Sequence, residues 1–325
     1  PLDHEKRWYR YHHLFRKLLL NQLNRQYSAK DINVLHAQAS AWFAENGQIV
    51  DALRHALAAG DVEKAGSIFA RAGHQMMNNE QWPQLEHCLH MLPRHYVEQD
   101  AALLVLESWL HHVRQNLSGM RTCLKRIEAL NATATPGAWV NVKHVKGHLE
   151  AQHGFIHYMD AEGESALASS QRALRDIPRH HKRARLFADI FQLGAYQMTG
   201  NLDIGLSIYH KSMSRYTERD KSYHAAYLGN LGLVYWIDAN LIALRQTAEF
   251  LMDVIKDHPQ STLAPYGLYL IGIAHYHRNE LHRAQEILAE VVRSNYATSP
   301  MNFAHSALAL TLTYQAQGKP GQARE

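Results

Sequence analysis

The sequence predicts an all-α fold, a superhelical solenoid built from stacked helix hairpins. The first observation is internal repetition, because four similar segments end at Leu202, Leu241, Leu281 and Pro320, at an almost constant interval. They read LGAYQMTGNL, LGLVYWIDANL, IGIAHYHRNEL and LALTLTYQAQGKP. A period of roughly 40 residues is typical of an array of helix pairs, in which each pair buries its apolar face only by stacking on its neighbours.

The second observation is the pattern of side chains within each copy. An aromatic residue or histidine stands six positions before each end point, at Tyr196, Tyr235, His275 and Tyr314, and a further copy is visible upstream at His157. Small residues recur at Gly154, Gly232 and Gly272, and again after the end points at Gly205, Ala284 and Ala323, with Leu244 in the third copy. We expect them where the second helix of a pair crosses the first closely. This Gly…Tyr…Ala spacing resembles the tetratricopeptide repeat, although the copies are a few residues longer than is usual in that family.

Composition agrees with a folded solenoid. The chain has 325 residues, of which 46% are hydrophobic, and a solenoid can exceed the length of one compact domain. Its two cysteines, Cys88 and Cys123, argue against a disulfide framework and favour a reducing, cytoplasmic location. No apolar run is long enough to span a membrane, so we expect no membrane partner. Because the chain starts at Pro1 and stops inside a repeat, we expect it to be part of a longer protein.

The first segment, residues 1–30, is predicted to be helical, basic and aromatic. It holds seven Lys and Arg residues but only two acids, Asp3 and Glu5. One interpretation is a solvated helix face whose core residues are Trp8, Tyr9, Leu14, Phe15 and Leu18. The alternative is a patch that binds nucleic acid or a negatively charged nucleotide.

Two runs near the start of the chain carry a more specific resemblance. RWYRYHHLFRKLL (Arg7 to Leu19) and LHAQASAWFAENGQIVDALRHALAAGD (Leu35 to Asp61) resemble the middle of the large ATP-dependent transcription regulators of the LuxR type. These belong to the STAND class and include the maltose-regulon activators. The resemblance is strong over residues 7–70 and concerns only the architecture beyond. It implies that residues 1–30 end a winged-helix segment, that 31–95 form a helical connector, and that 96–325 form a tetratricopeptide-like sensor domain.

The resemblance also implies partners outside this chain. In that family an ATPase domain comes first, with ATP and Mg²⁺ as its cofactors, and a LuxR-type DNA-binding domain comes last. The present sequence has no G-x-x-x-x-G-K-[ST] phosphate loop, so we expect no cofactor here. It has no helix-turn-helix after the repeats, so contact with DNA is expected only through the absent C-terminal domain. The sequence leaves self-association open.

The connector is predicted to consist of short helices with clear boundaries. Ser28 and Asp31 form a helix-start capping pair, and Asn46-Gly47 and Gly60-Asp61 end two helices. The predicted helices are Leu35–Glu45, Ile49–Ala59 and Val62–Asn79, with a buried stripe of Trp42, Phe43, Leu53, Leu57, Ile68 and Phe69. A shorter helix is expected between Pro83 and Pro93, then a pair in residues 100–130 that breaks at Asn116–Gly119. The run NATATPGA (Asn131 to Ala138) is predicted to be a loop.

The candidate binding residues follow from the register of the repeats. In tetratricopeptide arrays the first helix of each pair lines the concave surface, beside the Gly and Tyr core positions. That register places these residues there: Phe155, Tyr158, Phe187, Gln197, Met198, Leu233, Trp236, Tyr266, Tyr269, Tyr276 and His277. Aromatic side chains with a few polar tips suit a small, largely apolar or aromatic ligand. The alternative is that these rings are packed core, as most large aromatic side chains are.

Metal and catalytic sites are weakly indicated. The pairs His144/His148 and His153/His157 have a spacing that can present two imidazoles to one metal, but neither has an obvious third ligand except Glu150. No nucleophile elbow, dinucleotide loop or catalytic cysteine pattern occurs, and the acids look scattered over helix ends and polar faces. We therefore predict neither a metal site nor an enzyme.

Taken together, the sequence predicts the effector-sensing, regulatory region of a LuxR-type ATP-dependent transcription activator. A small-molecule inducer would bind the concave face of the repeats and favour one arrangement of the helices. One alternative is a protein–protein interaction scaffold whose groove takes a peptide or a partner helix. The other is an enzyme with an unrecognised site.

Overall fold

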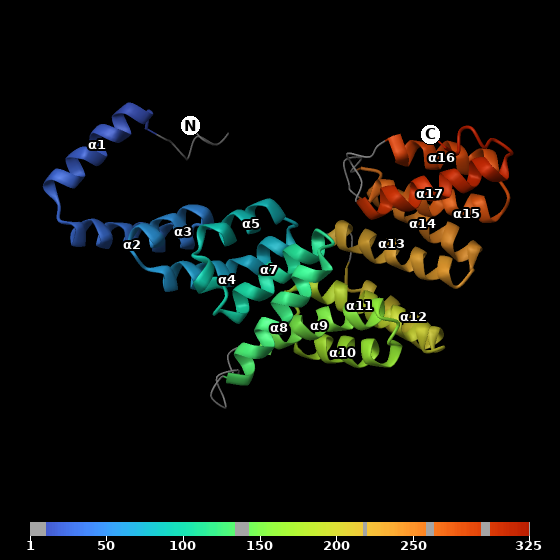
Figure 1. Cartoon of the computed structure of the whole chain (residues 1–325), viewed down its shortest axis with the longest axis horizontal. Coiled ribbons are helices and arrows are strands. Elements are labelled where there is room, and N and C mark those ends of the chain that lie inside the picture. The colour runs from blue at the N-terminus through green and yellow to red at the C-terminus, as the bar shows by residue number, and fades with distance from the viewer. Residues whose placement is uncertain (1–10, 134–142, 217–219, 258–262, 294–299, 325) are drawn as a thin grey trace. The chain divides into compact units, whose positions relative to one another are not determined.

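The computed structural model describes residues 11–133, 143–216, 220–257, 263–293 and 300–324. Within these ranges the regular secondary structure is helical, and the helices are joined mostly by short turns (Figure 1). This confirms the predicted all-α, solenoid class. Two units are distinguished by their internal contacts: unit 1 is Pro1–Leu149 with Ile177–Arg183, and unit 2 is Glu150–Asp176 with Ala184–Glu325. The predicted segment boundaries at residues 30 and 95 stay predictions.

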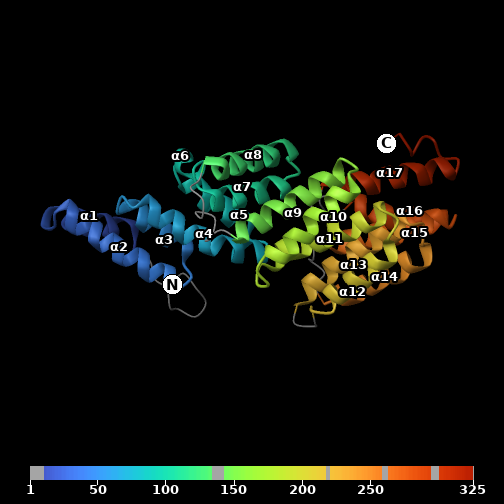
Figure 2. The same ribbon diagram turned by 90° about the horizontal axis from the view of Figure 1, so that it is seen from below.

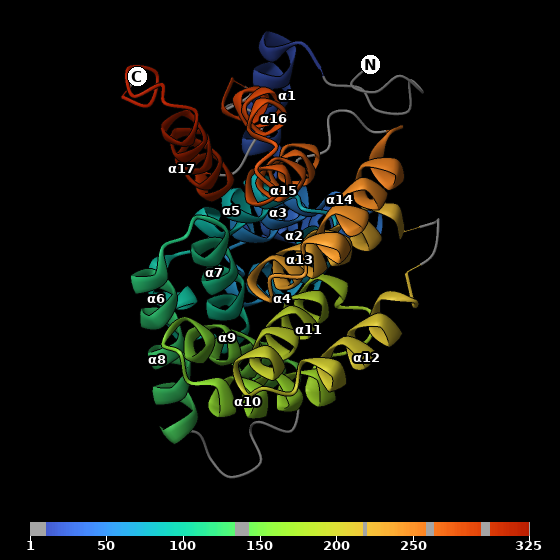
Figure 3. The same ribbon diagram turned by 90° about the vertical axis from the view of Figure 1, so that its right-hand side faces the viewer.

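Unit 1 begins with a series of helices that pack on one another in chain order. They are α1 (His13–Gln26), α2 (Ala29–Glu45), α3 (Ile49–Ala58), α4 (Val62–Asn78), α5 (Trp82–Met91), α6 (Arg94–Val97), α7 (Ala101–Val113) and α8 (Leu117–Thr133), followed by the start of α9 (Lys143–Met159). Helix α3 contacts both α2 and α4, and α7 lies against α8 (Figures 1 and 3). The predicted capping pair is confirmed, because Ser28 and Asp31 form a complete capping box.

Three expectations for unit 1 need correction. Helix α8 continues to Thr133, so the predicted loop at 131–138 starts later than expected, and its remainder lies outside the described residues. Trp42 is 49% exposed rather than buried, because α2 meets α3 through a different face, which carries Ser40 and Phe43. In α1 the supposed core residues are also exposed: Leu14, Phe15 and Leu18. Trp8 and Tyr9 lie outside the described residues.

Unit 2 repeats one hairpin along the chain. Its helices are the rest of α9, α10 (Gly163–Asp176), α11 (Lys182–Met198), α12 (Leu202–Met213), α13 (Lys221–Ile237), α14 (Leu241–Ile255), α15 (Ala264–His277), α16 (Leu281–Arg293) and α17 (Pro300–Ala316). Helix α13 pairs with α14 and α15 with α16, while α14 also contacts α15 and α16 contacts α17 (Figures 1 and 2). The buried core passes from hairpin to hairpin, through residues such as Tyr227, Leu231, Leu244 and Leu270.

The sequence repeat corresponds to one recurring turn. The backbone is left-handed at Ala161, Gly200, Ala239, Asn279 and Gly318, which recur at the interval of the sequence repeat. In each copy the N–H of the next residue donates to the carbonyl of the repeated aromatic or histidine position: Glu162 to His157, Asn201 to Tyr196, Asn240 to Tyr235, Glu280 to His275 and Lys319 to Tyr314, all at 2.8–2.9 Å. This is the Schellman arrangement, which satisfies carbonyls left over at a helix C-terminus.

Small residues allow the two helices of a hairpin to approach. A Cβ added to Gly205 in α12 would lie 2.7 Å from Cβ of Tyr196, and one added to Gly154 would lie 2.6 Å from Oγ of Ser170 in α10. Gly232 differs from the expectation. A Cβ there would meet Leu270 of α15 at 2.7 Å, so this glycine admits the neighbouring hairpin rather than its own second helix.

The left-handed turns give a direct test of the hairpin geometry. Ala239→Gly should stabilise the chain by about 0.5–1 kcal/mol, because an L-residue loses about 1–2 kcal/mol in this conformation and glycine recovers most of that. The matched change Gly200→Ala should destabilise it by about 1 kcal/mol, since an added Cβ meets no neighbour there and only the backbone is strained. Urea unfolding of both variants measures the two effects. If both substitutions changed the free energy of unfolding in the same direction, this account of the turn would be contradicted.

Candidate ligand-binding surface

The predicted binding residues come from the first helices of successive hairpins in unit 2, and the structure gathers most of them into two groups. In the first ring group, Phe155 and Tyr158 of α9 meet Phe187 and Phe191 of α11. The centroid of the Phe191 ring lies 4.9 Å from that of Phe155, 5.3 Å from Tyr158 and 4.7 Å from Phe187. Phe191 is therefore the centre of this group, although the sequence analysis did not select it.

The second ring group joins α13, α15 and α17. Tyr269 lies 6.3 Å from Trp236, 6.3 Å from Tyr266 and 6.0 Å from His305, measured between ring centroids. The indole N–H of Trp236 donates to Nε2 of His277 over 3.0 Å. Because indole is only a donor, His277 presents its other nitrogen as an N–H donor when neutral.

The two groups combine packed and accessible side chains. Phe187 is 7% exposed and Tyr269 2% exposed, so these two rings serve mainly as packing. The other predicted residues are accessible to different degrees. Those that are half-buried are Phe155, Tyr158, Gln197, Leu233, Trp236, Tyr266 and Tyr276, and those that are exposed are Met198 and His277. Each ring group thus contains one buried ring and several partly accessible rings.

Two of the rings pack directly against glycines of neighbouring helices, at positions where a Cβ atom would collide with them. A Cβ added to Gly194 would lie 2.5 Å from Cε2 of Tyr158, and one added to Gly229 would lie 2.9 Å from Cε1 of Tyr266. Burial raises the pKa of Tyr158 and raises that of Tyr269 to about 12, so both phenols stay neutral hydrogen-bond donors at neutral pH. The amide of Gln197 donates a long hydrogen bond, 3.5 Å, to the carbonyl of Val234 and so links α11 to α13.

A buried carboxylate ties the helices that carry these rings. Asp189 of α11 is 3% exposed and accepts hydrogen bonds from the Tyr227 hydroxyl at 2.5 Å and from Ser212 Oγ at 3.1 Å. The Tyr209 hydroxyl donates in turn to the carbonyl of Tyr227 at 3.2 Å. The sequence interpretation of scattered, solvated acids is therefore wrong for Asp189, which joins α11, α12 and α13.

The histidine pairs weighed as metal ligands separate in the structure. His157 Nδ1 pairs with Glu162 Oε2 at 2.6 Å, and the equivalent His275 pairs with Glu280 at 2.5 Å, so both support their hairpin turns. The ring of His153 meets that of His157 edge to face, with ring centroids 6.2 Å apart. His148 belongs to another cluster, with His74 and His181, and the side chain of His144 lies outside the described residues.

Known proteins match the chain in a consistent way. Residues 1–31 match the model of the MalT winged helix domain. The HTH-type transcriptional regulator MalT of Vibrio cholerae is 26% identical over 230 residues, which are 70% of this chain and 24% of that protein. The MalT regulator of Klebsiella pneumoniae is 24% identical over 224 residues, 69% of this chain and 24% of that protein. The chain is thus similar to MalT-type transcriptional regulators over about 70% of its length.

This relationship confirms the resemblance indicated by the runs Arg7 to Leu19 and Leu35 to Asp61. The chain spans about a quarter of the length of these MalT relatives, since the match covers 24% of each. Among solved structures, the apo form of RapI superposes with a TM-score of 0.52 at 10% identity, over 90% of this chain and 84% of RapI. At that identity the likeness concerns the fold alone. No helix in the described part of the chain is long and apolar enough to cross a membrane.

The buried carboxylate predicts a specific pH dependence. Burial raises the pKa of Asp189 above 3.8, against the opposing effect of its two hydrogen bonds and of Arg185 and Arg215. The folded state therefore binds this proton more tightly than the unfolded state, and stability falls as the pH rises from 3.8 through the raised pKa.

In Asp189→Asn this contribution should disappear. The free energy of unfolding of both proteins is measured by urea titration from pH 4 to pH 7. As the pH rises, the wild type should lose stability relative to the variant. A difference that is constant across this range would contradict the assignment of the raised pKa to Asp189.

Proposed function

We propose that this chain is the effector-sensing, regulatory region of a LuxR-type ATP-dependent transcription activator. The observation that carries the proposal is the pair of partly accessible ring groups on the first helices of unit 2, in a chain related to MalT-type regulators. The ligand is a small, largely apolar or aromatic inducer that stacks on these rings. The chain itself performs no catalysis.

The side chains around the rings fit such a ligand. Trp236, Tyr266 and Tyr158 offer apolar faces for stacking, because each ring is only half-buried. The N–H of His277 and the tyrosine hydroxyls supply a few hydrogen-bond donors that orient a polar substituent. The residues that define the two ring groups include no Asp, Glu, Lys or Arg, so binding relies on apolar area more than on ion pairs.

The remaining functions of the whole protein lie outside this chain. ATP and Mg²⁺ bind a separate ATPase domain, DNA contacts a separate DNA-binding domain, and the protein works in the cytoplasm. Residues 1–31 end the winged-helix domain, whose other residues cover the exposed apolar side chains of α1, including Leu14, Phe15 and Leu18. That packing accounts for a helix with no buried residue of its own.

An inducer controls such a region only through its differential affinity for two arrangements of the hairpins. A change from 1:99 to 99:1 needs about 5.5 kcal/mol. At about 25 cal/mol per Å² of apolar surface, this requires roughly 220 Å² that is buried in one arrangement and not in the other. Two or three aromatic rings that close on a ligand provide an area of this size.

Ligand binding is tested by thermal unfolding with small aromatic and alkyl compounds, beside acidic peptides of similar concentration. A bound compound should raise the unfolding temperature by mass action, and Trp236→Ala should abolish the shift without loss of the fold. The matched control is Trp42→Ala, which removes an exposed tryptophan from unit 1 and should leave the shift intact.

Other outcomes distinguish the alternatives. Stabilisation by the peptides alone would favour a protein–protein interaction scaffold. A shift that survives Trp236→Ala unchanged would contradict the proposed ring site.

A further inference from the structure

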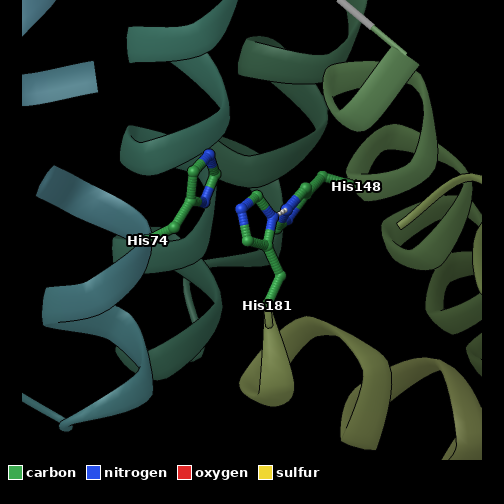
Figure 4. Close-up of side chains that lie close together, drawn as sticks. All are labelled: His74, His148 and His181. Carbon is green, nitrogen blue, oxygen red and sulfur yellow. Dashed lines mark hydrogen bonds between the residues drawn. The ribbon is translucent and has the colours of Figure 1, made fainter. Parts of the chain in front are cut away.

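Three buried histidines come together in unit 1, whereas the ring groups belong to unit 2. His74 lies on α4, His148 on α9, and His181 in the segment Ile177–Arg183 that ends at the start of α11. Their ring centroids are 4.0 Å apart for His74 and His181, 4.7 Å for His74 and His148, and 5.2 Å for His148 and His181 (Figure 4). All three side chains are buried.

The hydrogen bonds fix where the protons lie. The indole N–H of Trp109 in α7 donates to Nδ1 of His148 at 2.9 Å. Because indole can only donate, Nδ1 of His148 carries no hydrogen, and the neutral ring holds its proton on Nε2. Nε2 then donates to Nδ1 of His181 at 3.0 Å, the bond drawn in Figure 4. The two hydrogen bonds therefore run in one direction, from Trp109 to His148 to His181, and Nδ1 of His148 and Nδ1 of His181 both serve as acceptors.

This arrangement is unsuited to a metal ion, although one nitrogen from each ring lies within 4.8 Å of the others. Metal ligation requires ring lone pairs that converge in plane on one point, whereas His74 and His181 stack face to face with planes only 25° apart. His148 has no free lone pair unless it loses the bond from Trp109. No carboxylate belongs to the group to balance a buried dication.

The cluster anchors the segment Ile177–Arg183. Asn78, the last residue of α4, donates to the carbonyl of His180 at 2.7 Å and accepts from the backbone N–H of Arg183 at 3.1 Å. Arg183 pairs with Glu80 at 2.5 Å and lies over the ring of Trp82. Within this set of contacts the histidine cluster is the part that is both buried and titratable.

The charged groups nearby disfavour an extra proton. On the elements that carry the cluster or adjoin it, the charged and titratable groups include Glu80 after α4, His112 on α7, Lys146 and Glu150 on α9, and Asp176, His180, Lys182 and Arg183 in and beside the segment. These acids already have basic partners: Glu80 pairs with Arg183, Glu150 with Arg172 and Asp176 with Arg175. Burial, followed by the charge of Arg183, lowers the pKa of His112 to about 4, so His112, whose ring contacts Trp109, is neutral at physiological pH.

We propose that His74, His148 and His181 form a proton-operated latch, which holds the segment Ile177–Arg183 on α4 and α9 when neutral and releases it when protonated. A proton can reach Nδ1 of His148 or of His181 only after a hydrogen bond of the chain breaks. The released state therefore binds more protons than the latched state. The latch is stable above the ordinary histidine pKa of about 6.5 and weakens as the pH falls below it.

The test is hydrogen exchange of the whole chain, followed by mass spectrometry from pH 7.5 to pH 5.0 and corrected for intrinsic rates. Protection of amides 180–183 should fall about tenfold per pH unit below 6.5 for each proton taken up on release. The indole N–H resonance of Trp109, assigned through Trp109→Phe, should move over the same pH range. Protection that is unchanged down to pH 5.0 would overturn the proposal.

Variants separate the latch from general acid unfolding. His148→Gln keeps an acceptor for Trp109 and a donor for His181 but does not titrate. Its release should therefore take up about one proton fewer, so the protection of amides 180–183 should fall about tenfold less per pH unit than in the wild type. The matched control His112→Gln removes a half-buried histidine outside the stack, so protection should fall with pH as steeply as in the wild type. Equal steepness in wild type and His148→Gln would overturn the latch.

A metal is the competing outcome. One equivalent of Zn²⁺ at pH 7.5 should leave the protection of amides 180–183 within twofold of its value in EDTA. A larger, saturable increase that is lost in His148→Gln would replace the latch by a metal site. If His148→Gln does not fold, the wild-type pH profile and the Zn²⁺ titration still decide the question.

Discussion

One hydrogen bond organises unit 2: the bond from the residue after each left-handed turn to the carbonyl of the aromatic or histidine position that precedes the turn. It ends the first helix of every hairpin at the same place relative to its rings. The second helix then returns past a small residue such as Gly205, Ala284 or the equivalent Ala166. Because no hairpin buries its own apolar face completely, this fixed return is what lets successive hairpins stack.

The candidate ligand surface depends on this stacking. The rings of α9 reach those of α11, and the ring of Trp236 in α13 reaches Tyr269 in α15. Asp189 fixes α11 to its own partner helix α12 through Ser212 and to the next hairpin through Tyr227. A ligand that stacks on these rings therefore contacts side chains from neighbouring hairpins, which is the contact pattern needed to favour one arrangement of the repeats over another.

Much of the fold was predictable because the repeated turn leaves a local signal at a constant period. Phe155, Trp236 and Tyr269 could be assigned to the first helices of their hairpins from that register alone. Asp189 and the histidine cluster could not be predicted, because their partners are set by tertiary packing: His74, His148 and His181 lie on different elements and at spacings unrelated to the repeat. The predicted burial of Trp42 was wrong for a related reason. Helical periodicity identifies an apolar stripe but does not show which side of the stripe meets a neighbouring helix.

The ring site can be observed directly, because Trp236 is the only tryptophan in the sequence after Trp139. When the chain is labelled with 5-fluorotryptophan, the fluorine resonance of Trp236, assigned through Trp236→Phe, should shift in a saturable way as an aromatic or alkyl inducer is added. The resonances of Trp82 and Trp109 in unit 1 should stay in place. Saturable binding that leaves the Trp236 signal unmoved, or that moves only the tryptophans of unit 1, would contradict the account.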